Sequence, residues 1–372
     1  MRAWVYTQSG LPSQTLTQTT VSAPTASDLG PHDVLVEVHY VSLNAICTAM
    51  MRALPPQPFS LGLPFRSRSA IPEFEFAGRI LATGSQVPAA RPELSPDTQI
   101  LGCVSEQQVF GSGKGALAER LVVPASQIIP LISPELKSSD PETAPEPPVS
   151  LLEGSGLTAC GCTAIQTVDA TRLIAGDKLF VNGGSTSVGM LTLQVARHVL
   201  GPTGTIVASC SAANAPLLRS LGADEVVDYT AHDPLHAYLR AHHAARPFDA
   251  IVDCVGDPEI YAHCVPYLAE GKPFINLGQM KATPGFWGQI AWAWTQFATR
   301  YWPVVLGGVP RAYQFYGGKP TVESMQRIMR LVEKGVVRVV VDSVWRMGEV
   351  RKAYERMESK RAKGKIVVSV RE

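Results

Sequence analysis

The sequence lacks the features that mark a disulfide-bonded or nucleic-acid-binding protein. Its seven cysteines form an odd set without any Cys-x-x-Cys pair, which argues against a disulfide framework and a four-cysteine zinc site. The chain has 33 basic and 32 acidic residues, so its net charge is too small to attract a nucleic acid or an anionic membrane. Residues 1–8 contain no apolar run of signal-peptide length and read as a first strand. We therefore expect a cytoplasmic protein.

Long apolar runs are also missing, and the nearest approach to a membrane span is the aromatic stretch 286–309. Gln289, Gln296 and Arg300 interrupt it, so we do not expect it to cross a membrane. Aromatic residues remain dense as far as residue 316. They predict either an apolar wall over a bulky, hydrophobic small-molecule substrate or the contact surface of a homodimer, because aromatic residues also concentrate at interfaces.

The length of 372 residues predicts two domains. Short β-like runs over 34–41, 74–81 and 115–123 are separated by turns, which is typical of a β-barrel-like domain. The proline-rich piece 133–148 is too polar and too broken for a core element, so we expect an exposed loop or linker.

From residue 177 onward the pattern changes to strands that alternate with segments of helix length. This alternation predicts a parallel, doubly wound sheet of an α/β protein. Near the end, 337–342 and 365–370 read as strands around a helix over 347–360, and the last strand is expected to pair back with the first domain. The predicted strands of the parallel sheet are 178–182, 205–209, 225–229, 250–255 and 273–277.

The strongest motif is the glycine-rich turn between the predicted strand 178–182 and the helix that follows it. A dinucleotide requires such a turn, because its pyrophosphate lies against backbone N–H groups and a helix N-terminus. Thr186 stands where glycine is usual, and its hydroxyl either bonds a phosphate oxygen or signals weakened binding. The residues of this predicted cofactor site are Gly183, Gly184, Ser185, Thr186, Ser187, Val188 and Gly189.

The end of the next strand indicates which cofactor is bound. An NAD-preferring site carries Asp or Glu about 20 residues beyond the loop. Here residues 209–214 offer hydroxyls and an amide but no acid, so a 2′-phosphate meets no repelling carboxylate. The sequence therefore favours NADPH over NADH.

Eight short phrases occur in an order that resembles the medium-chain dehydrogenases/reductases, in particular the zinc-independent quinone oxidoreductases and enoyl reductases. The resemblance covers nearly the whole chain. It implies a GroES-like β-barrel substrate domain over 1–155 and 320–372, and a Rossmann NADPH-binding domain over 156–319. The phrases are 41–44, 76–78, 115–119, 161–164, 183–189, 221–224, 248–256 and 364–367.

The same resemblance implies roles for individual residues around the cofactor. Residues 185–188 would hold the pyrophosphate, and Lys365 would reach back toward the nicotinamide from the last strand. The other implied contacts are Ser209, Ser211 and Asn214 with the 2′-phosphate, Tyr229 with the adenosine end, and Val255, Gly256, Leu277 and Gly278 with the nicotinamide.

Zinc ligands are missing at the positions where zinc-dependent members of this family carry them. Asn44 stands in place of the first cysteine, and Phe74, which cannot ligate a metal, replaces the histidine of a Gly-His-Glu phrase. Cys47, Cys103 and Cys162 are expected to be packing residues. We therefore predict no metal, and a substrate already activated by conjugation.

The resemblance also implies that Asn44 is the catalytic residue, as a hydrogen-bond donor to the developing enolate oxygen, because its family counterpart lies near the nicotinamide and the substrate carbonyl. The competing interpretation is an ordinary turn residue at a strand end. The leading functional prediction is an NADPH-dependent reductase of a conjugated C=C bond or a quinone. The alternatives are a trans-acting enoyl reductase on a carrier-bound polyketide of a synthase, and a non-catalytic NADPH-binding protein.

Overall fold

The computed structural model describes residues 1–53, 69–132, 146–278 and 286–371, so most of the predicted loop 133–148 lies outside the described residues. The chain divides into two compact units. The first contains 1–162, 320–335 and 339–372, and the second contains 163–319 and 336–338. The first border between these units lies at Cys162, inside helix α5 (Thr158–Thr171), and the second lies at residues 319/320. The domain bounds that the resemblance implies stay a prediction.

The first unit is built on a sheet in which the last strand of the chain lies next to one of the first. Strand β15 (Lys365–Ser369) pairs in parallel with β14 (Val341–Arg346) and antiparallel with β3 (Asp33–Ser42). The prediction that the final strand returns to the first domain is confirmed. Beyond β3 the order continues with β4 (Glu75–Thr83), β5 (Gln99–Cys103) and β7 (Ile128–Pro130), while β6 (Arg120–Pro124) also pairs with β3, and β1 (Arg2–Val5) pairs with β2 (Thr17–Thr20).

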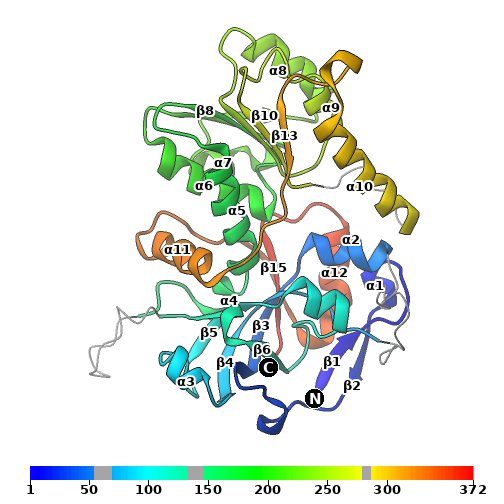
Figure 1. The fold of residues 1–372 in the computed structure, drawn as a ribbon, viewed down its shortest axis with the longest axis vertical. Helices are drawn as coiled ribbons and strands as arrows, with labels where there is room; N and C mark the ends of the chain where they lie inside the picture. Colours follow the sequence, from blue (N-terminus) through cyan, green and yellow to red (C-terminus); the bar gives the residue numbers. More distant parts are fainter. Residues whose placement is uncertain (54–68, 133–145, 279–285, 372) are drawn as a thin grey trace. The chain divides into compact units, whose positions relative to one another are not determined.

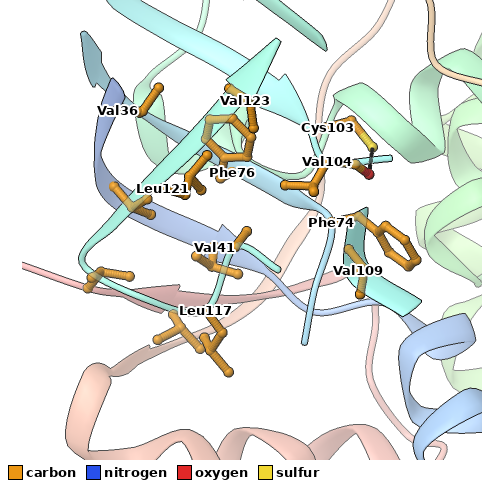
Figure 2. Packing of buried hydrophobic residues seen from close by; sticks show 14 of the residues in the cluster. Val36, Val41, Phe74, Phe76, Cys103, Val104, Val109, Leu117, Leu121 and Val123 are labelled. Carbon is orange, nitrogen blue, oxygen red and sulfur yellow. Dashed lines mark hydrogen bonds between the residues drawn. The ribbon is translucent and has the colours of Figure 1, made fainter. Parts of the chain in front are cut away.

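Alternating apolar residues form the core of this unit. Val36 pairs in register with Leu121, and Val41 pairs with Phe76. All four are buried, and Figure 2 shows them gathered between the strands. Around the sheet lie α1 (Pro12–Thr15), α2 (Ala45–Ala53), α3 (Val87–Ala90), α4 (Leu151–Gly154), α11 (Val322–Glu333) and α12 (Val350–Glu358).

The second unit contains a six-stranded sheet in which every pairing is parallel, as predicted (Figure 1). Its order is β10-β9-β8-β11-β12-β13, so the direction of winding reverses between β8 and β11. Ligands of such sheets bind beyond the carboxyl ends of the strands at that reversal. The strands are β8 (Lys178–Asn182), β9 (Thr205–Cys210), β10 (Glu225–Asp228), β11 (Ala250–Asp253), β12 (Pro273–Asn276) and β13 (Ala312–Phe315).

Helices connect these strands: α6 (Ser187–Leu200), α7 (Ala215–Ser220), α8 (Leu235–His243), α9 (Pro258–Ala262) and α10 (Phe286–Tyr301). The aromatic stretch forms α10, a helix of 16 residues. Among the described residues no helix has both the length and the apolar character needed to cross a membrane.

Two predicted strands differ from the observed ones. Within 115–123 only the part from Arg120 is a strand, because residues 115–117 instead make irregular backbone hydrogen bonds to residues 71–73. The strand predicted over 337–342 begins at Val341, since Val336–Arg338 joins the second unit, where the backbone N–H of Arg338 binds the side chain of Gln194.

Candidate active site

The glycine-rich turn after β8 is shaped by close backbone contacts. Gly183 has φ +73°, a conformation that favours glycine. A Cβ atom on Gly189 would lie 2.4 Å from the carbonyl oxygen of Gly183, so α6 can approach the turn only with glycine there. The N-terminus of α6 is thereby brought close to the turn, as a dinucleotide site requires.

Thr186 closes this turn with its hydroxyl. The hydroxyl donates to the carbonyl oxygen of Gly183 (2.9 Å) and accepts from the backbone N–H of Gly189 (3.0 Å). Thr186 is therefore the N-cap of α6, a role for which threonine is well suited. The hydroxyl of Thr186 is thus already used within the turn. A direct hydrogen bond from Thr186 to a phosphate oxygen stays a prediction.

The residues predicted to hold the 2′-phosphate fall into two groups. Ser209 is fully buried, and its hydroxyl donates to Asn182 (2.6 Å) and accepts from the backbone N–H of Gly183 (2.9 Å). Its position supports the turn rather than a phosphate. Ser211 and Asn214 lie just before α7, and the buried Oδ1 atom of Asn214 has no hydrogen-bond partner within the described part of the chain. Tyr229, with 51% of its surface exposed, lies after β10.

The four residues predicted to line the nicotinamide are brought together. The backbone N–H of Leu277 donates to the carbonyl oxygen of Asp253 (2.8 Å). A Cβ atom on Gly278 would lie 2.0 Å from the carbonyl carbon of Val255 and 2.3 Å from the nitrogen of Gly256. The two turns therefore touch through their backbones, and only glycine at position 278 allows it.

Asp253 organises this contact, although sequence reasoning assigned it no role. Its buried carboxylate accepts from the backbone N–H groups of Val255, Gly256 and Asp257 and from the side chain of Asn182. Burial raises its pKa to about 6, against the opposing effect of these hydrogen bonds. The available signal was an acid that ends the apolar strand 250–253.

In the first unit, Lys365 lies in a buried polar cluster. Its ammonium group donates to Glu75 (2.6 Å), to Oδ1 of Asn44 (3.2 Å) and to the carbonyl oxygen of Leu43 (3.4 Å), and it lies 3.5 Å from Sγ of Cys160. The side chains of Lys365 and Glu75 are 3% and 0% exposed. Burial favours the neutral amine, but the adjacent Glu75 carboxylate outweighs it and raises the pKa of Lys365. The predicted reach of Lys365 toward the nicotinamide stays a prediction.

Asn44 is held in the same cluster by both ends of its amide. The Nδ2 atom donates to the carbonyl oxygen of Ser42 (2.9 Å) and to Oε2 of Glu73 (3.2 Å), while Oδ1 accepts from Lys365. An asparagine side chain has two N–H donors, and both are used. The structure thus brings Asn44 and Lys365 together, but it leaves Asn44 without a free donor for an enolate.

Glu73 ties this cluster to a distant helix. It accepts from the backbone N–H of Asn44 (3.0 Å) and from the hydroxyl of Tyr354 in α12 (2.5 Å). Burial raises the pKa of Glu73 to about 7, although the bonds from Tyr354 and Asn44 oppose it. Its φ of +75° is unusual for a residue other than glycine.

Cys160 is the partly exposed member of the cluster. Burial raises the pKa of its thiol to about 11, with the nearby Lys365 ammonium opposing this effect. The side chain is therefore a thiol at neutral pH, not a thiolate nucleophile. Sequence reasoning missed Cys160, Glu75 and Tyr354 as members of this cluster, since residues from such separate segments carry no common spacing.

Phe74 and three cysteines behave as the sequence predicts. Phe74 is buried and packs edge-on against Phe110, with ring centroids 5.3 Å apart, beside Val104 and Val109 (Figure 2). Cys47, Cys103 and Cys162 are also buried. Within the described residues, no group of three or more His, Cys, Asp or Glu side chains is placed to hold a metal ion.

Comparison with known proteins adds to this geometry. Models of an alcohol dehydrogenase GroES-like domain and of a zinc-binding dehydrogenase match residues 30–133 and 221–368. The chain is 59% identical to the trans-enoyl reductase poxH of Penicillium oxalicum, over 100% of this chain and 98% of that protein. It is 32% identical to the medium chain reductase pydE of Acremonium sp, over 100% and 99%. The quinone oxidoreductase structure from Coxiella burnetii has the same fold, with a TM-score of 0.74 at 20% identity over 100% and 99% of the two chains.

Proposed function

Because the chain belongs to the medium-chain dehydrogenases/reductases and is an oxidoreductase of that family, we propose that it acts as an NADPH-dependent, zinc-independent enoyl reductase in trans. Its substrate would be an α,β-unsaturated acyl chain tethered to a carrier of a separate synthase. The observation that carries this proposal is the 59% identity, over the whole chain, to a protein named as a trans-enoyl reductase. Of the functions predicted from sequence, the identity favours this alternative over a free quinone or enone.

The residues around the glycine-rich turn fit NADPH. Gly183 and Gly189 keep the turn free of side chains, so backbone N–H groups and the first turn of α6 would hold the pyrophosphate. The hydroxyl of Ser211 and the amide Nδ2 group of Asn214 would donate to the 2′-phosphate, where no acid stands at the end of β9. Val255, Gly256, Leu277 and Gly278 would line the nicotinamide.

The chemistry that NADPH supplies when bound is a hydride, which suits the β-carbon of a conjugated acyl group. Negative charge then develops on the substrate carbonyl oxygen. Both N–H groups of Asn44 are used, so we assign Asn44 a positioning role and take water as the source of the proton for the α-carbon. A conjugated thioester is electrophilic enough not to need a Lewis acid, in keeping with Phe74 in the apolar core.

We further propose that the protein works in the cytoplasm, where a carrier-bound substrate of a synthase would be presented to it. The chain would then act with two partners, the acyl chain and the carrier that presents it. A homodimer stays a prediction, and the exposed outer side of α10 is where we would look for it.

The test is cofactor oxidation by purified, chelator-treated protein with three acceptors: an enoyl thioester of N-acetylcysteamine, an aromatic ortho-quinone and a saturated aldehyde. We expect turnover of the thioester with NADPH and at least ten times less with NADH. Turnover of the quinone alone would favour the free-substrate reductase. Turnover of the aldehyde, or activity that returns only when zinc is added, would contradict the proposal, and tight NADPH binding without any turnover would favour a non-catalytic protein.

A further inference from the structure

The second unit contains a cavity of about 590 Å³ whose lining residues lie on β11 and the turn after it, β12, β13, α9, α10 and the chain after α10. Small-molecule sites have volumes of roughly 300–1,000 Å³, and their walls are mainly apolar with a few placed polar groups. Aromatic side chains form part of this wall, and Trp292 of α10 is fixed edge-on against Phe315 with ring centroids 4.8 Å apart. The aromatic wall is formed by Tyr261, Phe274, Trp292, Trp302 and Tyr313.

The position of the cavity relates it to the predicted cofactor site without overlapping the phosphate loop. Gly256 and Asn276 are among the lining residues, and each belongs to or adjoins a turn that we expect to line the nicotinamide. None of the residues 183–189 contributes to the described lining. The cavity is thus placed to receive a molecule that reacts at the nicotinamide, rather than the phosphates of the cofactor.

One polar group in this wall points to a specific ligand atom. The backbone N–H of Gly278 donates to Oδ1 of Asn276 (2.8 Å), which fixes the orientation of that amide. Its Nδ2 atom must then donate to Oε1 of Gln296 (3.2 Å), and the hydroxyl of Tyr313 donates to the same oxygen. The oxygen of Gln296 is therefore occupied, and its amino group is left as a donor without a hydrogen-bond partner among the described residues.

The charge of the wall restricts the ligand further. The described lining includes the carboxyl groups of Asp253 and Asp257 but no lysine or arginine. A free carboxylate or a phosphate would be repelled and would find no counter-charge. An uncharged molecule is accepted, provided that it is mainly apolar and carries an oxygen that can accept a hydrogen bond.

We propose that this cavity binds the distal part of the acyl chain of the tethered substrate, with the amino group of Gln296 donating to a keto or hydroxyl oxygen on that chain. The inference rests on the proposed function and makes it more specific. A chain held as a thioester is neutral, whereas the same chain as a free acid is not. The inner side of α10 therefore selects the length and oxygenation of the acyl chain.

The test compares three 2-enoyl thioesters of N-acetylcysteamine at saturating NADPH: a four-carbon chain, a twelve-carbon chain, and a twelve-carbon chain with a distal keto group. Ala298→Phe fills the cavity, and Gln296→Leu removes the donor. Trp294→Ala is the matched control, because Trp294 lies on the same helix, is 69% exposed and is not part of the lining.

We expect Ala298→Phe to lower kcat/KM at least ten-fold for both long chains and less than two-fold for the short one. Gln296→Leu should lower it about five-fold for the keto chain only, as loss of one neutral hydrogen bond implies. Trp294→Ala should change none of them. Equal effects on all three chains, or a rise in the KM for NADPH in place of these changes, would overturn the assignment of the cavity.

Direct binding separates this inference from the proposed function. Calorimetry with the saturated twelve-carbon keto thioester and NADPH should show binding to the wild-type protein and at least ten-fold weaker binding to Ala298→Phe. If the wild-type protein reduces no thioester yet shows this difference, the proposed activity fails and the binding site stands. Equal binding to both proteins would contradict the site, whatever the activity.

Discussion

The candidate site residues of the two units are held in opposite ways. In the first unit, Asn44, Glu75 and Lys365 satisfy one another through side chains, and the cluster is nearly closed to solvent. In the second unit, the turns at 183–189 and 277–278 are shaped by the backbone, with glycines that leave room for a ligand. One part is held by charge and hydrogen bonds between distant segments, and the other by the absence of side chains.

This difference separates the residues that are suited to bind a cofactor from those that only hold other side chains in position. The polar groups of this cluster are used in hydrogen bonds within it. They therefore hold one another in position and are poorly suited to bind a ligand. Open backbone turns keep their N–H groups directed outward and are suited to bind. Substitutions should therefore affect stability most in the first unit and cofactor affinity most in the second.

The largest effect is expected for Lys365→Met. The substitution leaves the carboxylate of Glu75 buried without its counter-charge, which costs about 3–5 kcal/mol of the free energy of unfolding. Urea denaturation followed by circular dichroism measures it. The double variant Lys365→Met with Glu75→Gln is the control, because glutamine is neutral and can still accept from the backbone N–H of Ala159. The double variant should be more stable than Lys365→Met alone, and a further loss of stability would show that the pair is not coupled.

Glu73→Gln tests the same cluster through pH. The folded-state pKa of Glu73 is about 7, above the ordinary value of 4.5, because the carboxyl is buried. Between these two pH values the unfolded chain has lost this proton and the folded chain keeps it, so the wild-type protein loses stability as the pH rises, by roughly 3 kcal/mol in all. The variant should not show this loss. Parallel stability curves for the two proteins from pH 4.5 to 8 would show that Glu73 does not titrate in this range.

Gly278→Ala is the corresponding test in the second unit. The new Cβ atom would lie 2.0 Å from the carbonyl carbon of Val255, so the two turns must separate. We expect about 100-fold weaker NADPH binding, since displacements of about 1 Å at a site have effects of this size. Titration of protein fluorescence measures it. Gly317→Ala is the control, because no atom lies within 4 Å of its added Cβ and its φ is ordinary. Similar affinities in both variants would place the cofactor elsewhere.

A smaller effect is expected for Asn214→Ala. If the side chain contacts the 2′-phosphate, its removal should weaken NADPH binding about five-fold, as expected for one hydrogen bond, and leave NADH binding unchanged. The ratio of the two dissociation constants is the measurement. A loss of affinity for both cofactors alike would indicate that Asn214 supports α7 rather than reading the phosphate.

The sequence predicts what depends on short segments. Both types of sheet, the position of β8 and the turn 183–189 could be read from apolar periodicity and glycine spacing, because these act within a few residues. The roles of Glu75, Cys160 and Tyr354 could not, because their contacts cross 84 to 290 positions of the chain. The role of Asn44 also depends on a distant residue. Its residue type suggested a hydrogen-bond donor, but Ser42 and Glu73 already accept both of its N–H groups.

Helix α10 is a second region whose role could not be predicted from the sequence alone. Its aromatic residues suggested either a substrate wall or a contact between copies, and the two interpretations could not be separated by composition. The structure assigns Trp292 and Gln296 to a cavity and leaves Trp287 and Trp294 77% and 69% exposed. Which side of a helix a residue occupies depends on the elements packed against it, and these are not encoded in the helix itself.

The place of β15 in its sheet bears on how the protein is made. This strand lies between β14 and β3, so its residues are interior to the sheet although they are translated more than 300 positions after those of β3. During synthesis, the first unit must wait with β3 lacking one neighbour and Glu75 lacking Lys365, while most of the second unit can already fold on the ribosome. The emergence of a single late strand thus completes the first unit, and until then an open sheet edge is exposed to other nascent chains.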